Sequence, residues 1–184
     1  MGFTLLVLGV LVWSGSHLWK RLAPAHRARF GEGGKGIVSI LSLIAIVLMV
    51  LGYRWAPYVQ IWPESRSLVP LNNLLMLLSF YLFAASGMKT AATRIVRHPQ
   101  LWGARLWALA HLMVNGDLAS LILFGGLFAW AQVEVALYNR DNPVWDKSGA
   151  PAAMGKEIGA IVGAVLLVGI VGYIHIWLGL RPWG

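Results

Sequence analysis

The sequence predicts an all-α fold, a polytopic integral membrane bundle of about six transmembrane helices. Of the 184 residues, 58% are hydrophobic and only 12% are charged, and the mean hydropathy is +0.68. Soluble domains carry about 25% charged residues. The apolar residues also occur in runs close to the roughly 20 residues that cross a bilayer as a helix. This composition excludes a disordered chain and argues against a water-soluble globule.

Six apolar stretches account for the predicted spans. The first lacks the basic leading region of a cleaved signal peptide, so we expect it to be retained. Pro70 suits the first turn of the third, and Asp117, after Asn115-Gly116, is expected to cap the fifth. The fourth is barely long enough to cross, and a buried re-entrant segment is the alternative. The stretches are residues 2–19, 36–53, 67–88, 99–114, 118–133 and 158–180.

The charges predict how the spans are oriented. Loops 20–35, 89–97 and 139–157 carry five, three and three Lys or Arg, whereas the other side carries only Arg54, Arg66 and Arg181. The positive-inside rule places the basic loops in the cytoplasm, and the expected location is a bacterial inner membrane. Because the excess charge of +8 sits in loops between apolar runs, we expect no nucleic-acid partner. Without repeats or a separate soluble region, residues 1–184 are predicted to form a single domain.

Histidines inside the apolar stretches are the candidate ligands. Polar side chains at membrane depth are costly and usually face a bundle interior. The chain has no Cys, so imidazole is the ligand to consider. His17 and His111, on different helices, are a candidate pair that would hold a haem from both sides. The alternative is that each is a packing residue bonded to a carbonyl one turn away. His175 is expected to be a polar residue near the interface, beside Trp177.

Depth argues against a simple pairing of the two. At 1.5 Å per residue, His111 lies roughly 18 Å into its helix and His17 roughly 5–8 Å into its own. Helix tilt, or a first helix that continues towards Pro24, would close much of this gap.

Other polar residues carry further expectations. Arg105 is expected to reach the headgroups or to hold a propionate or phosphate anion. Glu134 is expected to pair with a nearby Lys or Arg, and Asn72 and Asn73 to cap the start of the third span. The glycine-rich residues 31–36 precede an apolar helix, not a strand–helix unit, so they predict a flexible loop and no nucleotide site.

Two segments resemble the NnrU family. One is Arg97-His98-Pro99-Gln100-Leu101-Trp102-Gly103 followed by residues 106–116, Leu-Trp-Ala-Leu-Ala-His-Leu-Met-Val-Asn-Gly; the other is Ser14-Gly15-Ser16-His17. The likeness covers about residues 3–135. The family includes bacterial proteins linked to denitrification and nitric oxide metabolism, and the plant enzyme 15-cis-zeta-carotene isomerase.

The resemblance implies a cofactor. The isomerase members are membrane haem b proteins, and their axial ligands correspond to His17 and His111. The family therefore implies haem b with these two metal ligands, and Arg105 and His98 are added as further cofactor-binding residues. An alternative Cys ligand of the isomerase falls near Ala108, so ligand exchange by a thiolate is not expected. Expected partners are the lipid bilayer, a hydrophobic small molecule or nitric oxide, and a membrane oxidoreductase.

Two other functions stay open. Arg97-His98-Pro99 followed by Gly103 also resembles the membrane methyltransferases that use S-adenosylmethionine at the cytoplasmic face. Those enzymes usually carry paired acidic residues after the next helix, and here only Glu134 occurs. The third reading is a non-catalytic membrane assembly or sensing factor. The sequence leaves open whether the chain is an enzyme at all.

Overall fold

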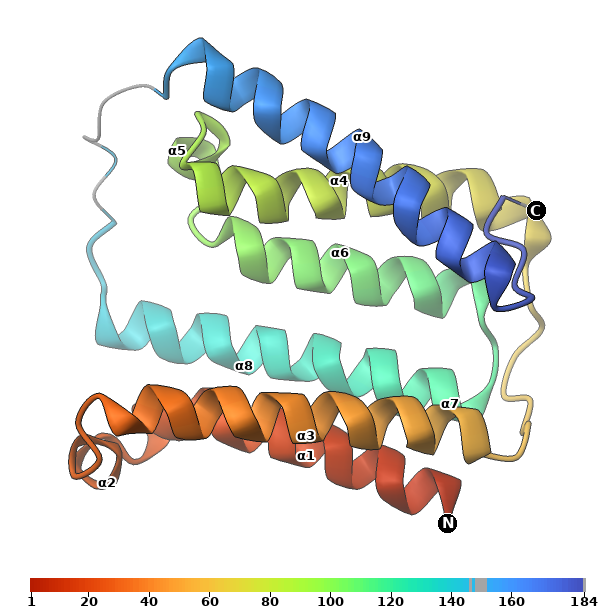
Figure 1. The fold of residues 1–184 in the computed structure, drawn as a ribbon, viewed down its shortest axis with the longest axis horizontal. Coiled ribbons are helices and arrows are strands. Elements are labelled where there is room, and N and C mark those ends of the chain that lie inside the picture. Colours follow the sequence, from red (N-terminus) through yellow and green to blue (C-terminus); the bar gives the residue numbers. More distant parts are fainter. Residues whose placement is uncertain (146, 148–151, 184) are drawn as a thin grey trace. The chain divides into compact units, whose positions relative to one another are not determined.

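The computed structural model describes residues 1–145, 147 and 152–183, and this part of the chain is helical, as predicted (Figure 1). Pairing between extended segments is limited, among these residues, to one isolated bridge between Gln60 and Asp117. A 3₁₀ turn, Arg66–Leu68, leads into α4, and a π-helical turn, Leu121–Gly125, joins α7 to α8. The α-helices are α1 (Gly2–Leu22), α2 (Pro24–Ala28), α3 (Gly33–Trp55), α4 (Val69–Met88), α5 (Ala92–Ile95), α6 (Pro99–Val114), α7 (Leu118–Ser120), α8 (Gly126–Asp141) and α9 (Met154–Trp177).

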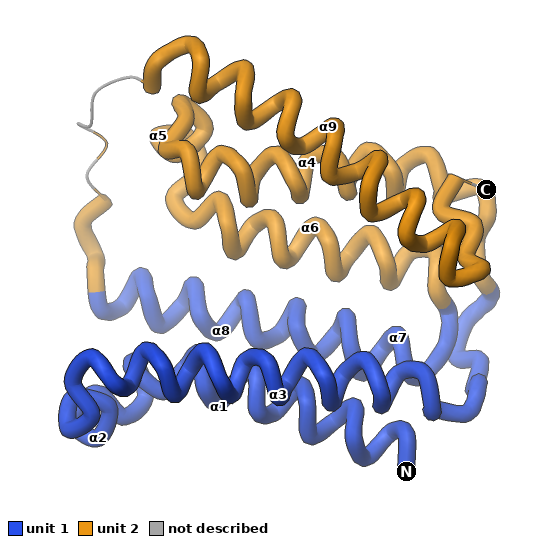
Figure 2. Tube along the Cα trace, viewed as in Figure 1, with its two compact units in different colours: residues 1–63, 116–141 blue, residues 64–115, 142–184 orange. Residues whose placement is uncertain are grey.

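The chain divides into two compact units (Figure 2). Unit 1 comprises Met1–Pro63 and Gly116–Asp141, and contains α1, α3 and the continuous segment from α7 to α8. Unit 2 comprises Glu64–Asn115 and Asn142–Gly184, and contains α4, α6 and α9. That residues 1–184 act as a single domain stays a prediction.

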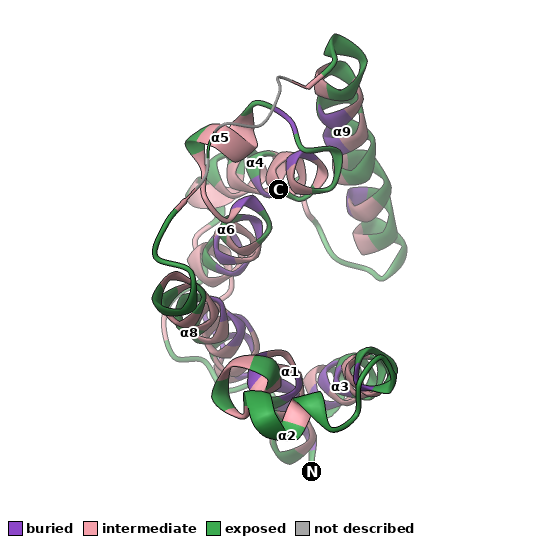
Figure 3. Cartoon of the chain, turned by 90° about the vertical axis from the view of Figure 1, so that its left-hand side faces the viewer, coloured by how far each residue is buried: buried purple, intermediate pink, exposed green. Residues whose placement is uncertain are grey.

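Five helical segments are long and apolar enough to cross a membrane, so the chain is an integral membrane protein. They correspond to the first, second, third, fifth and sixth predicted spans. The fourth predicted span is present as α6, but its 16 residues make it shorter than the others, so "about six" is approximate. Exposed residues lie along α3 and α9 (Figure 3), and many of them are large and apolar, so contact with lipid is expected there. The five segments are Gly2–Leu22, Gly33–Trp55, Arg66–Met88, Leu118–Asp141 and Met154–Trp177.

In unit 1, glycines bring α1 and α3 into close contact. A Cβ atom at Gly52 of α3 would lie 2.7 Å from the Cα of Leu6 on α1. A Cβ at Gly9 of α1 would lie 2.7 Å from Cγ of Met49 on α3. Real side-chain atoms do not approach this closely, so the crossing depends on these glycines. Small residues serve the same purpose at helix contacts throughout membrane proteins.

In unit 2, α4 packs against both α6 and α9. A Cβ at Gly103 of α6 would lie 3.0 Å from the carbonyl oxygen of Ser79. The buried Ser79 hydroxyl donates to the Gly103 carbonyl at 2.8 Å, so a hydrogen bond joins the two helices. At the first turn of α9, Glu157 accepts a hydrogen bond from the Ala91 amide at 2.7 Å.

Two local predictions are confirmed and two are wrong. Pro70 lies in the first turn of α4, and Asp117 caps α7 by accepting from the Ser120 amide at 2.9 Å. Asn72 and Asn73 do not cap α4, because the helix already begins at Val69 and the Asn72 amide donates to the Asn73 side chain instead.

The expected glycine-rich loop is mostly helix. Gly31 has a positive φ of 47° in the turn, but α3 begins at Gly33. Gly34 then packs against Arg27, whose Nε atom would lie 2.6 Å from a Cβ there.

Candidate functional site

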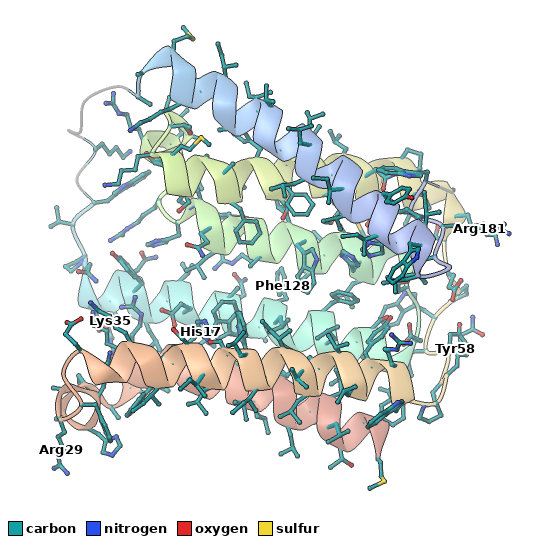
Figure 4. The ribbon with its side chains drawn as sticks, viewed as in Figure 1. His17, Arg29, Lys35, Tyr58, Phe128 and Arg181 are labelled. Carbon is teal, nitrogen blue, oxygen red and sulfur yellow. The ribbon has the colours of Figure 1, made fainter. Side chains whose placement is uncertain are left out.

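His17 lies on α1 (Figure 4), and its imidazole contacts indole rings from two helices. Its Nδ1 atom is 2.8 Å from the carbonyl oxygen of Trp13, one turn earlier. Its ring stacks on Trp13 with centroids 4.2 Å apart. Trp130 of α8 meets it edge-on at 5.3 Å. The imidazole is therefore fixed both by its own helix and by a neighbouring one.

One helical turn further along α1, a charged pair joins the same two helices. Arg21 Nε donates to Glu134 Oε1 at 2.6 Å, and these side chains are only 17% and 12% exposed. The guanidinium also lies 4.4 Å over the Tyr138 ring and 3.7 Å from Asp141. The predicted pairing of Glu134 with a basic residue is confirmed, and Arg21 is its partner. Residues four apart on a helix share one face. We use the name α1–α8 seam for six such residues: Trp13, His17 and Arg21 of α1, and Trp130, Glu134 and Tyr138 of α8.

His111 lies on α6 in unit 2, in a turn like that of His17. Its Nδ1 atom is 2.8 Å from the carbonyl oxygen of Trp107. The two rings are tilted, with centroids 5.2 Å apart. The Asn115 side chain donates to the His111 carbonyl at 2.9 Å, which satisfies an acceptor at the end of α6.

A shared sequence pattern, Trp-x-x-x-His, relates the two histidines. Each lies four residues after a Trp, and the residues between are small except for Leu109, in Trp13-Ser14-Gly15-Ser16-His17 and Trp107-Ala108-Leu109-Ala110-His111. The spacing places each imidazole over the preceding Trp of the same helix face. His175 of α9 also points its Nδ1 at a carbonyl one turn earlier, that of Val171 at 2.8 Å. The residue four positions before His175 is Val171, not Trp, so His17 and His111 share the pattern and His175 does not.

The other predicted cofactor-binding residues lie on or next to α6, in unit 2. Arg105 is only 8% exposed, and its guanidinium carbon lies 4.8 Å from the centre of the Trp102 ring. His98 occupies the N-cap position, where its side chain makes no capping hydrogen bond. Its carbonyl accepts from the Trp102 amide at 2.9 Å. Arg97 donates to the Asn142 carbonyl. Three of the four predicted residues, His98, Arg105 and His111, thus belong to one helix and its cap, and His17 belongs to unit 1.

The described residues contain no group of three or more His, Cys, Asp or Glu side chains that is able to hold a metal ion. This finding gives no support to a free metal ion held wholly by protein side chains. A haem needs a different donor set, with at most two axial ligands, so its binding stays a prediction.

The comparisons with known proteins bear on the chain as a whole. No curated protein and no solved structure matches it. A family model described as NnrU protein matches residues 5–182, which include all five spans almost in full, the His17 turn and α6. The chain therefore belongs to the NnrU family.

Proposed function

We propose that this integral membrane protein binds haem b through His17 and His111 and acts in nitric oxide or denitrification metabolism, or in an isomerase-like redox reaction. The observation that carries the proposal is the pair of matching Trp-x-x-x-His turns. In both, Nδ1 is 2.8 Å from the Trp carbonyl oxygen. Membership of the NnrU family supports the link to this metabolism.

The donor set fits haem iron for a chemical reason. A neutral imidazole that donates its Nδ1 proton to a backbone carbonyl has its tautomer and ring orientation fixed, and its Nε2 lone pair is directed away from that carbonyl. Two such rings are suitable axial ligands for haem. When bound, haem would supply a redox-active iron in a medium of low dielectric.

Arg105 and His98 are proposed as further contacts to the haem. A guanidinium forms charge-assisted hydrogen bonds to a carboxylate, so Arg105 would hold a propionate. Its position over Trp102 restricts the side chain and keeps its donors away from bulk water. His98, at the N-cap position of the same helix, would supply an imidazole donor near the start of α6.

The orientation and location follow from the charges. We propose that loops 20–35, 89–97 and 139–157 face the cytoplasm of a bacterium and that the protein resides in the inner membrane. Part of the last loop lies outside the described residues. A membrane oxidoreductase that exchanges electrons with the haem is the proposed partner, and nitric oxide or a hydrophobic small molecule is the proposed ligand.

The optical spectrum of detergent-purified protein tests the haem proposal. We expect a Soret band, with sharpened α and β bands in the reduced-minus-oxidised spectrum. His17→Ala and His111→Ala should each lose the low-spin spectrum. His175→Ala is the matched control, because it removes an imidazole with the same carbonyl contact and should leave the spectrum unchanged. A cofactor-replete preparation without a haem spectrum contradicts the proposal.

The methyltransferase reading ranks second. The placement of His98 as the cap of α6, next to Arg97 and Pro99, is the observation that favours it. Saturable binding of S-adenosylmethionine that is lost in His98→Ala and kept in His111→Ala would support this reading over haem. An assembly or sensing role is supported if neither cofactor binds.

A further inference from the structure

Three buried polar atoms in the α1–α8 seam have no hydrogen-bond partner among the described residues. They are Nε1 of Trp13, Nε1 of Trp130 and Oε2 of Glu134. The two indole rings touch, with centroids 5.6 Å apart, and Trp130 and Glu134 are four residues apart on one face of α8. Two donors and one acceptor therefore lie along one short stretch between two helices.

Unpaired polar atoms at membrane depth are costly. Each loses the hydrogen bonds that it makes to water in the unfolded chain, and lipid offers no replacement. In native proteins, such atoms usually bind ordered water or another ligand. Three of them in one interface therefore indicate a bound species and not an accident of packing.

The chemistry of the three atoms restricts that species. The indole nitrogens donate and the carboxylate oxygen accepts, so the ligand must both accept and donate. The charges are already balanced: Arg21 pairs with Glu134 and lies near Asp141, and Asp141 pairs with Arg140 at 2.9 Å. A free cation or anion would leave a net charge in the seam. Water is the small neutral molecule that both donates and accepts, and it typically needs two to four polar partners in a buried site.

We propose that the α1–α8 seam binds a short file of water molecules. The file leads from the charged end of unit 1, at Arg21 and Asp141, past Glu134 and the two indoles to His17. It would be a polar route by which a small polar reactant reaches the surroundings of this imidazole inside the membrane. The proposal rests only on groups of unit 1 and holds with or without haem.

Radiolytic footprinting of the full-length protein in detergent tests the route. X-ray pulses generate hydroxyl radicals from bound water, so side chains beside buried waters are oxidised even where bulk solvent does not reach. Mass spectrometry then gives an oxidation rate for each residue. We expect Trp13 and Trp130 to be oxidised several-fold faster than Met49. Met49 is the dry reference because it is a reactive side chain, is only 7% exposed, and packs in the apolar contact between α1 and α3 of the same unit. Trp13 and Trp130 are half-buried, so part of their excess oxidation in the wild type is independent of the charged pair, and the double variant isolates the part that depends on it.

A double variant tests the part played by the charged pair. Arg21→Leu with Glu134→Leu removes the acceptor without leaving an unpaired charge, and it should lower the Trp13 and Trp130 rates towards that of Met49. A low Met49 rate in the variant shows that unit 1 is still folded. Wild-type Trp13 and Trp130 as protected as Met49, or rates unchanged in the folded double variant, would overturn the proposal. The haem spectrum of the same samples is scored separately, so failure of one proposal is not read as failure of the other.

Discussion

The two Trp-x-x-x-His turns have the same local geometry in different surroundings. In both, the imidazole Nδ1 is 2.8 Å from the Trp carbonyl oxygen. His17 is also held from another helix, by Trp130, and a buried ion pair lies one turn away. His111 is oriented by Trp107 of its own helix. The Trp-x-x-x-His pattern therefore sets the direction of the imidazole ring, whereas the neighbouring helix sets how polar the surroundings of that ring are.

The two units also differ in how their helices come together. In unit 1, Gly9 and Gly52 allow α1 and α3 to approach closely. In unit 2, the approach of α6 to α4 at Gly103 is accompanied by the buried Ser79 hydrogen bond. Substitutions that act on one feature of each unit therefore test the comparison.

Breaking the ion pair of the seam should have the largest effect. Glu134→Leu leaves Arg21 buried without its main partner, and loss of one member of a buried pair costs about 3–5 kcal/mol. We expect about 3 kcal/mol, the lower end of that range, because Asp141 remains 3.7 Å from Arg21. Denaturant unfolding of the purified protein in detergent measures the free energy of unfolding.

The control removes both charges. Arg21→Leu with Glu134→Leu should recover most of the lost stability, because an apolar pair needs no desolvation. If the single and the double variants are equally destabilised, the stability of unit 1 depends on the shape of these side chains and not on their charge.

Closing the helix approach in unit 1 should come next. Gly52→Ala places a methyl group against the backbone of Leu6, and overpacking of this kind costs about 1–3 kcal/mol. Gly163→Ala, at a position of α9 with open space around it, should instead stabilise by roughly 0.5–1 kcal/mol through the lower entropy of the unfolded chain. The same unfolding assay measures both, and the two substitutions should have opposite signs.

Much of this arrangement follows from the sequence, and the exceptions have physical reasons. The lengths and positions of the apolar runs predicted the helices, because a bilayer admits few alternatives to a helix at that length. Pro70 and Asp117 act locally, so their roles could be predicted. The proposed capping by Asn72 and Asn73 was wrong because Pro70 already lies in the first turn, so α4 begins at Val69, before both residues.

The contacts between α1 and α8 in the seam could not be predicted from local sequence. Glu134 and Arg21 are 113 residues apart, and which basic residue meets which acid depends on how α8 packs on α1. The same holds for Trp130 against His17. By contrast, the Trp-x-x-x-His repeat was present in the sequence and could have been found by comparing the residues four positions before each histidine.

The aromatic contacts of the two histidines can be compared directly by double-mutant cycles. Trp130→Leu and His17→Ala should show a coupling energy of about 0.5–1.5 kcal/mol, typical of an aromatic pair across an interface. Trp107→Leu and His111→Ala should couple by about 0.2–0.5 kcal/mol, typical of neighbours on one helix. Equal couplings would contradict the expectation that the ring contact between two helices, at His17, couples more strongly than the ring contact within one helix, at His111.

Removing the hydrogen bond between α4 and α6 should have the smallest effect. Ser79→Ala deletes the donor to the Gly103 carbonyl, and hydrogen bonds between membrane helices contribute about 0.6 kcal/mol on average. The cost stays low because the carbonyl lies within α6 and has a second lone pair for its own helix. Ser39→Ala is the matched control, since its hydroxyl donates to the Lys35 carbonyl at 3.1 Å on an exposed face of α3 and should not change unfolding measurably. A loss at Ser79 as large as that at Gly52 would mean that unit 2 depends on this bond as heavily as unit 1 depends on its glycines.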